Sequence, residues 1–156
     1  MPLPFEGFVA VLDSRTDAHG LRTLAPQALV APLDTALDLA DRKLRGDLDL
    51  PSLELALVLT RLDENPLAPD QRDLIWRAFG VPVFEQLQDH DGRTLARECE
   101  VHDGLHVDAA ASLPAALAGE LVNGHCECGN EAPRLQRKGP ARQRAAAAAA
   151  GARTGT

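Results

Sequence analysis

The middle of the chain alternates between strand-like and helix-like patterns, and this order constrains the fold more than any other feature. Residues 53–60 form an almost continuous apolar run that predicts a buried strand, although its leucines and alanines also suit a helix. Residues 70–79 place apolar side chains three or four positions apart and stop at Gly80, which predicts a helix with Trp76 in the core. Residues 81–87 alternate and predict another strand. The order strand, helix, strand indicates an α/β architecture.

The segment before residue 53 fits the same architecture. Residues 5–12 contain an apolar run that predicts a short strand, and residues 13–23 are rich in turn-forming residues and predict a loop. Residues 32–45 have apolar side chains three or four positions apart, with acidic residues early and basic residues late. Gly46 follows them, so we predict a helix whose charges complement its dipole and whose end is set by a glycine.

The second half of the chain contains mostly strand patterns. Asp91 and Gly92 form the dipeptide typical of a short hairpin, and they predict a return strand over residues 94–101. Residues 104–108 and 119–122 predict two more short strands. The fold class that we predict is therefore α/β, or α+β, with a short αβ start and a small, partly antiparallel β region.

Charge is unevenly distributed along the 156 residues. Residues 1–133 contain all 23 acidic residues and ten basic ones, a net charge of −13, whereas residues 134–156 contain six basic residues and no acid. We expect residues 1–133 to form one compact domain and residues 134–156 to form a solvated, disordered, Ala/Arg-rich tail; the alternative is a tail that contacts acidic partners or its own domain. An acidic domain repels phosphate backbones, so we expect no nucleic-acid partner.

Composition also restricts the cellular setting. No apolar run approaches the roughly 18 residues that a transmembrane helix needs, so we expect no membrane span. Residues 1–6 lack the basic start of a secretory signal. Three cysteines are too few, and odd in number, for a disulfide framework. These features predict a cytoplasmic protein whose thiols are free or bind a metal.

Sulfur and imidazole groups recur in the second half of the chain. Cys99 and His102 are three positions apart, and Cys126 and Cys128 are separated by one residue in a glycine-containing loop. Zinc binds four such ligands in a tetrahedron, so we predict a structural zinc site made of these four residues. Two other histidines are alternates to His102 in this prediction: His106 and His125.

A simpler interpretation of the same residues stays open. Cys99 suits a buried strand thiol, and Cys126 and Cys128 suit surface thiols without a metal. If three cysteines and one histidine all bind, the coordination sphere is closed and the zinc is structural, whereas a catalytic zinc keeps a position for water.

Several segments together resemble a known family. They are Arg72–Glu85, Glu98-Cys99-Glu100 followed by Gly104-Leu105-His106, Gly119–Val122, and Cys126–Gly129 followed by Pro133-Arg134-Leu135. Because these segments occur in the same order and with similar residues, residues 53–135 resemble part of the phenylacetate–CoA ligase-type enzymes of the adenylate-forming superfamily. The resemblance implies a partial fold of such an enzyme.

The chain departs from this family at the positions that carry its chemistry. Where the family continues from its Val-Phe-Glu-Gln-like strand into Tyr-Gly and a magnesium-binding Glu, this chain has Leu87-Gln88-Asp89. Nothing resembles the family's Ser/Thr/Gly-rich phosphate loop, and its catalytic Lys has no match. We therefore assign no catalytic and no nucleotide-binding residue, and we expect no ATP binding.

Three functions fit these patterns. The first is a non-catalytic, zinc-stabilised accessory or binding module that acts as a homodimer or beside a protein partner. The second is a subunit of a split acyl- or aryl-CoA ligase that acts with a partner chain. The third is a regulatory interaction protein whose basic tail binds an acidic surface.

Overall fold

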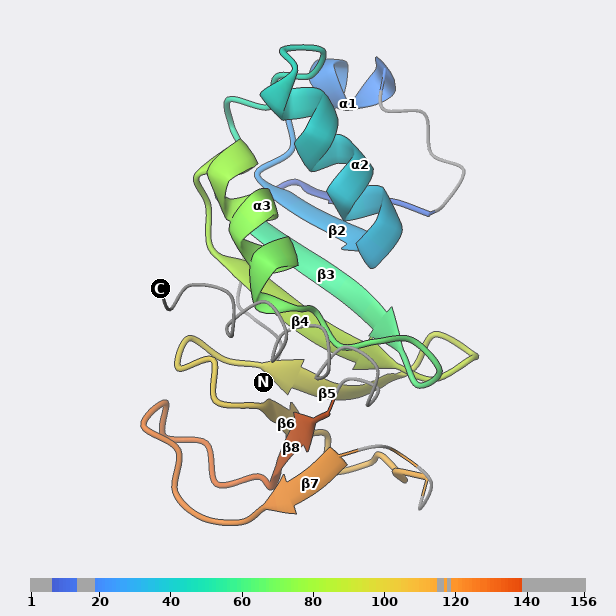
Figure 1. Cartoon of the computed structure of the whole chain (residues 1–156), viewed down its shortest axis with the longest axis vertical. Helices are drawn as coiled ribbons and strands as arrows, with labels where there is room; N and C mark the ends of the chain where they lie inside the picture. The colour runs from blue at the N-terminus through green and yellow to red at the C-terminus, as the bar shows by residue number, and fades with distance from the viewer. Residues whose placement is uncertain (1–6, 14–18, 115–116, 118, 139–156) are drawn as a thin grey trace, which may run out of the picture.

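One mixed sheet of eight strands organises the molecule (Figure 1). The computed structural model describes residues 7–13, 19–114, 117 and 119–138. The strand order is β1-β2-β3-β4-β5-β6-β8-β7, with β1 to β4 parallel and the pairs from β4–β5 onward antiparallel. The predicted α/β class is confirmed. The elements, in chain order, are β1 (Val9–Val11), α1 (His19–Leu24), β2 (Ala28–Pro32), α2 (Leu33–Leu44), β3 (Leu55–Arg61), α3 (Pro69–Phe79), β4 (Val83–Gln88), β5 (Thr94–Glu98), β6 (Leu105–Val107), β7 (Gly119–Val122) and β8 (Arg134–Arg137).

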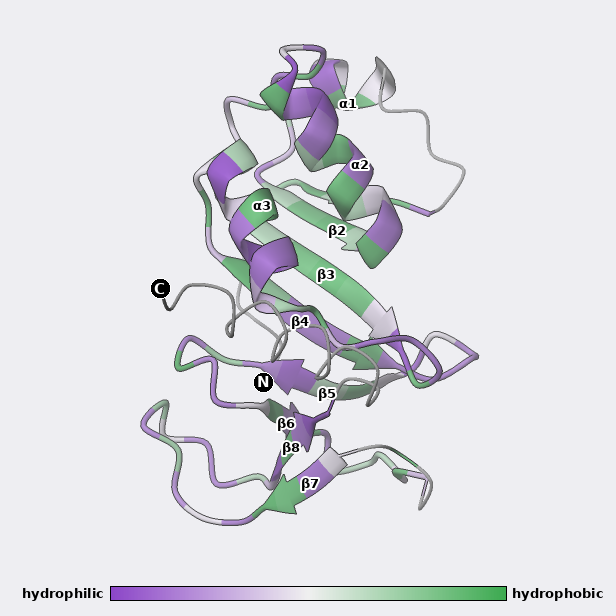
Figure 2. Ribbon diagram, viewed as in Figure 1, coloured by the Kyte–Doolittle hydropathy of each residue, from purple (hydrophilic) through white to green (hydrophobic). Residues whose placement is uncertain are grey.

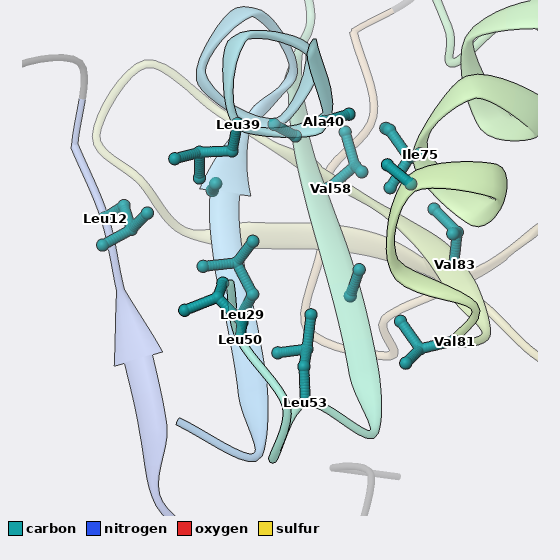
Figure 3. Close-up of a cluster of buried hydrophobic side chains, with 14 of the residues drawn as sticks. Leu12, Leu29, Leu39, Ala40, Leu50, Leu53, Val58, Ile75, Val81 and Val83 are labelled. Carbon is teal, nitrogen blue, oxygen red and sulfur yellow. The ribbon is translucent and has the colours of Figure 1, made fainter. Parts of the chain in front are cut away.

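Two helices cover one face of the parallel half of the sheet. In Figure 1, α2 lies over β2 and β3, and α3 lies over β4. Residues of each helix contact residues of the strands beneath it. Every second residue of the parallel strands faces these helices, and the helices contribute apolar side chains such as Ile75 to the same buried cluster (Figure 3). Figure 2 shows β2 and β3 as mainly hydrophobic and the helices α2 and α3 as mixed, as expected for helices with one buried face.

Local sequence explains the ends of α3. Pro69 occupies the first helical position, where a missing N–H costs nothing, and the Gln71 side chain accepts a hydrogen bond from the backbone N–H of Ala68 at 3.0 Å. At the other end, Gly80 adopts φ 69° and donates its N–H to the Trp76 carbonyl at 2.7 Å. This is the glycine end that the sequence predicts.

A hairpin begins the antiparallel half. The N–H of Asp89 donates to the Arg93 carbonyl at 2.9 Å, and Gly92 adopts φ 80° in the turn. The Asp89 carboxylate also accepts the N–H groups of Asp91 and Arg93. The predicted hairpin is thus confirmed, although its return strand β5 ends at Glu98 rather than at residue 101. This half has its own small buried cluster: Leu87, Leu95, Ala96, Leu105 and Leu135.

Four features differ from the predictions. A strand was not predicted at Ala28–Pro32, yet β2 pairs with both β1 and β3. The predicted loop 13–23 ends in α1, because Leu21 is buried in the core; residues 14–18 lie outside the described residues. Trp76 is 56% exposed rather than in the core, because α3 turns that side away from the sheet. The first four residues of the predicted tail form β8.

The β8 strand carries basic residues that pair with the acidic domain. Arg134 forms an ion pair with Asp103, and Arg137 forms one with Glu85. These ion pairs stabilise residues 134–137 as a strand of the sheet. The sheet therefore continues past the predicted boundary at residue 133. The rest of the predicted tail, from residue 139, lies outside the described residues. Within the described ranges, no helix combines the length and hydropathy that a membrane span requires.

We predict that Leu29→Ala lowers the free energy of unfolding by about 2–5 kcal/mol, because it leaves a cavity in the core between β2 and α2. Leu44→Ala is the matched control, since Leu44 is 53% exposed, and we expect it to change stability by less than about 0.5 kcal/mol. Urea denaturation followed by circular dichroism measures both. Equal effects would show that Leu29 is not in the core.

Candidate metal centre

Three cysteines and one histidine come together at the end of the antiparallel half. Cys99 directly follows β5, and His106 is the middle residue of the neighbouring strand β6. Cys126 and Cys128 lie in the loop between β7 and β8, where the N–H of Gly129 donates to the Cys126 carbonyl at 2.8 Å. Gly129 adopts φ 81°, which lets this loop turn tightly toward the strands. The ligand atoms of the four residues all lie within 4.8 Å of one another.

The separations of these atoms suit a tetrahedral metal ion. The Sγ atoms of Cys99 and Cys126 are 3.8 Å apart, and Cys128 Sγ is 3.3 Å from His106 Nε2. Zinc–sulfur bonds of about 2.3 Å at tetrahedral angles place two sulfurs roughly 3.8 Å apart, and a sulfur and an imidazole nitrogen roughly 3.6 Å apart. All three cysteines are free thiols in the structure. The four donors could therefore close around one small ion with little movement.

The His106 ring is oriented by the backbone. Its Nδ1 is 3.2 Å from the carbonyl oxygen of Ala132, and a carbonyl can only accept a hydrogen bond. Nδ1 must therefore carry the hydrogen in this contact. A neutral imidazole then leaves Nε2 unprotonated and facing Cys128. Histidines that bind metals are held in this way by a partner on their second nitrogen.

The thiols differ in acidity because their surroundings differ. The backbone N–H of Cys128 is the largest cause that lowers the pKa of Cys126 to about 7, and hydrogen bonds from the Cys128 and Cys99 side chains act in the same direction. Burial raises the pKa of Cys99 to about 11, against the effect of a hydrogen bond from the Val101 backbone. Cys126 is thus converted to the thiolate, the form that binds metals, more readily than Cys99.

The other two predicted histidines lie outside this group. His102 follows Cys99 in a turn, in which the His102 N–H donates to the Cys99 carbonyl at 3.0 Å and His102 adopts φ 56°. The turn directs its ring onto Phe84, with ring centroids 5.1 Å apart. His125 is exposed in the β7–β8 loop. Of the three candidates for the fourth ligand, the structure brings only His106 to the cysteines among the described residues.

His102 instead belongs to a second cluster of polar residues. Its Nδ1 is 3.1 Å from a Glu98 carboxylate oxygen, which also accepts a hydrogen bond from Arg72 at 2.8 Å. The other Glu98 oxygen accepts the backbone N–H of Glu85 at 2.8 Å. Both oxygens of this buried carboxylate are therefore used in joining α3, β4 and the turn after β5.

A second buried carboxylate continues this network. Glu85 accepts hydrogen bonds from the Thr60 hydroxyl at 2.7 Å, from Arg137 at 2.9 Å and from the Leu67 backbone at 3.2 Å. The side chains of Glu85 and Arg137 are only 6% and 5% exposed. Arg137 also donates to the Thr60 hydroxyl and to the carbonyls of residues 61 and 64. The pair is thus fully satisfied and joins β8 to β3 and β4 across the sheet.

A cleft of about 540 Å³ borders this network. Its lining includes Arg72, His102, Leu135 and Arg137. The Glu85, Glu98 and Arg137 side chains beside the cleft already form hydrogen bonds and ion pairs with other residues of the chain. The sequence patterns did not predict this network. A signal that could indicate it is a polar residue within each strand, Thr60 after the apolar run of β3 and Glu85 directly after Val83 and Phe84 in β4.

One solved structure identifies the fold. An open conformation of 2-hydroxyisobutyryl-CoA ligase, in complex with 2-HIB-AMP and CoA, is similar to this chain with a TM-score of 0.57 and 17% sequence identity. The similarity covers 76% of this chain and 34% of the ligase chain. No family model and no curated protein matches the sequence.

This chain therefore shares the fold of part of an acyl-CoA ligase of the adenylate-forming type, at a distance. The match supports a distant resemblance to such a ligase, as the sequence patterns imply. The chain spans about a third of the length of the ligase that it matches.

We predict that Glu85→Ala lowers the free energy of unfolding by about 3–5 kcal/mol, because it leaves the Arg137 charge buried without its carboxylate. Glu120→Ala removes the carboxylate of the exposed pair with Lys138, and we expect a loss below about 1 kcal/mol. Chemical denaturation compares the two variants. Similar losses would contradict the structural role given to Glu85.

Proposed function

We propose that this chain is a non-catalytic, zinc-stabilised accessory or binding module with the fold of part of an acyl-CoA ligase. One observation carries the proposal: the ligand atoms of Cys99, His106, Cys126 and Cys128 lie within 4.8 Å of one another. Three sulfurs and one imidazole nitrogen form a donor set that suits zinc, whereas hard cations such as Mg²⁺ and Ca²⁺ take oxygen ligands.

The zinc in this proposal is structural. Four protein ligands complete a tetrahedron and leave no position for a water molecule that could act as a nucleophile. The ion would join the end of β5, the strand β6 and the β7–β8 loop. These strands have three to five residues each, and their buried cluster is small, so a metal would contribute stability that packing alone supplies poorly.

The residues at the position of the family's nucleotide turn support a role without catalysis. Leu87 is fully buried in the second core, and the Asp89 carboxylate accepts two backbone N–H groups in the hairpin. In the related enzymes, as the resemblance implies, an aromatic-glycine turn and a magnesium-binding Glu follow this strand. Here the same stretch closes a hairpin, and its side chains are engaged in packing and turn formation.

A subunit of a split acyl- or aryl-CoA ligase is the second candidate. It is favoured by the match to 34% of a ligase chain, since a partner chain would have to supply the rest of such a fold. ATP–pyrophosphate exchange with aryl and acyl acids separates the two candidates. The accessory module gives no exchange alone or with a candidate partner, whereas a split ligase gives exchange only when both chains are present. Exchange by the purified chain alone would contradict both.

We predict that the chain, purified without a histidine tag, contains about one zinc ion per molecule. His106→Ala should lose most of this zinc during dialysis, because it removes one of the four ligands. His102→Ala is the matched control: it removes an imidazole that lies three residues from Cys99 but stacks on Phe84. Atomic emission spectroscopy of the dialysed proteins measures the zinc content.

The two histidine variants also distinguish the competing ligand sets. Zinc loss in His102→Ala with retention in His106→Ala would contradict the proposed site. A wild-type protein without zinc after growth in zinc-supplemented medium would remove the metal from the proposal altogether. If the ion is structural, a chelator that removes the zinc should also lower the melting temperature of the protein.

A further inference from the structure

Two cysteine sulfurs of the candidate metal centre lie within reach of each other. The Sγ atoms of Cys99 and Cys126 are 3.8 Å apart, and both residues are free thiols. A disulfide bond is about 2.0 Å long, so the two sulfurs need to approach each other by roughly 1.8 Å. Cys99 directly follows β5, and Cys126 lies in the β7–β8 loop. A bridge between them therefore requires no residue to leave a strand.

The third cysteine is placed differently. The Sγ atom of Cys128 faces Nε2 of His106 at 3.3 Å. Cys128 also shares a turn with Cys126, which the Gly129 N–H closes by donating to the Cys126 carbonyl at 2.8 Å. A bridge within this turn would strain it, because a disulfide needs a specific separation and direction of the two Cβ atoms. The geometry therefore favours Cys99 as the partner of Cys126.

The two sulfurs differ in accessibility, and this difference gives each a separate role in oxidation. Cys99 is partly exposed, whereas Cys126 is only 1% exposed. A metal-bound cysteine is a thiolate, and accessible thiolates are the cysteines most susceptible to oxidation. Cys99 is therefore the sulfur of this pair that a small oxidant reaches first. Cys126 lies behind it and can react with the oxidised product.

We propose that Cys99 and Cys126 are a peroxide-sensitive pair that hydrogen peroxide joins in a disulfide, and that this bond displaces the zinc ion. The first part concerns the two sulfurs alone. The second part rests on the proposed function, because it requires zinc at the site. The pair would make the metal content of the module respond to peroxide.

The oxidation has two balanced steps. The Cys99 thiolate attacks one oxygen of hydrogen peroxide, the O–O bond breaks, and the hydroxide that leaves takes a proton and becomes water. This step oxidises the sulfur to a sulfenic acid and reduces the peroxide. The Cys126 thiolate then attacks the Cys99 sulfur, the S–S bond forms, the S–O bond breaks, and a second hydroxide leaves and becomes water. Two thiolates, two protons and one peroxide thus give one disulfide and two water molecules.

The disulfide would take over the connection that the ion makes. It leaves the metal centre with two ligands, Cys128 and His106, whereas structural zinc sites use four. The ion should then pass to a chelator. The bond joins the end of β5 to the β7–β8 loop, which are two of the segments that the ion would hold together. We therefore expect the oxidised chain to stay folded without zinc.

Peroxide treatment of the full-length, zinc-loaded chain tests both parts of the proposal. Free thiols should fall from three to one per chain. A chromogenic chelator should detect about one released zinc ion per chain, and the circular dichroism spectrum should stay unchanged. Dithiothreitol with added zinc should restore both the thiols and the metal.

Peptide mapping identifies the bonded pair. A glutamate-specific protease cleaves after Glu100 and Glu127, which places the three cysteines on three different fragments. Mass spectrometry without reduction should find the fragments of Cys99 and Cys126 linked. A link that includes Cys128, or a disulfide between two copies of the chain, would contradict the proposed pair.

Two matched variants test the role of each accessible sulfur. Cys99→Ser and Cys128→Ser each remove one partly exposed sulfur from the candidate metal centre, but only Cys128→Ser keeps the pair. In metal-free protein, Cys99→Ser should lose thiols to peroxide on the order of tenfold more slowly than Cys128→Ser. Equal rates would contradict the pair. Circular dichroism checks that both variants are folded, and the map of the wild-type chain decides the pairing without them.

The outcomes separate this inference from the metal proposal. A chain that binds no zinc but forms the Cys99–Cys126 bond supports the pair and contradicts the zinc site. A zinc-loaded chain whose cysteines resist peroxide, or become sulfinic acids without a bond, leaves the zinc site in place and overturns the pair. Zinc that stays bound after the disulfide has formed overturns the displacement.

Discussion

The approach of three cysteine sulfurs to one imidazole nitrogen is the constraint through which the proposed zinc ion would stabilise the antiparallel half of the sheet. Cys99 directly follows β5, His106 lies in β6, and Cys126 and Cys128 lie in the β7–β8 loop; the ligand atoms of all four lie within 4.8 Å of one another. The strands β6, β7 and β8 have three or four residues each. Short strands with few apolar contacts are marginal without a further constraint, and a bound metal would supply one by joining residues 99 and 106 to a loop at least twenty residues further along the chain.

The two halves of the sheet are held together by charge as well as by strand pairing. Glu85 lies in β4 and Arg137 lies in β8, and their buried ion pair links strands that are not neighbours. Glu98 extends the network to α3 through Arg72. A buried network of this kind is favourable only when every member has partners, and each of these carboxylates accepts at least three hydrogen bonds or ion-pair contacts.

Periodicity predicted the elements that pack against the large core, such as β3 and α3, because burial on one side determines their apolar spacing. It missed β2, whose apolar run is short and leads directly into α2. It missed β8 because the sequence Arg-Leu-Gln-Arg is mostly polar, and its burial depends on carboxylates far along the chain. It favoured His102 over His106 as a metal ligand for a related reason. Spacing along the chain brings His102 near Cys99, but pairing of β5 with β6 brings His106 to the sulfurs.

X-ray absorption spectroscopy at the zinc edge of the purified chain tests the central claim most directly. The account predicts three sulfur neighbours at about 2.3 Å and one nitrogen neighbour at about 2.0 Å. When His106→Ala protein is reloaded with zinc, its spectrum should lack the scattering from the imidazole ring. A first shell made only of oxygen and nitrogen, or fewer than three sulfurs, would show that these four side chains do not hold a metal together.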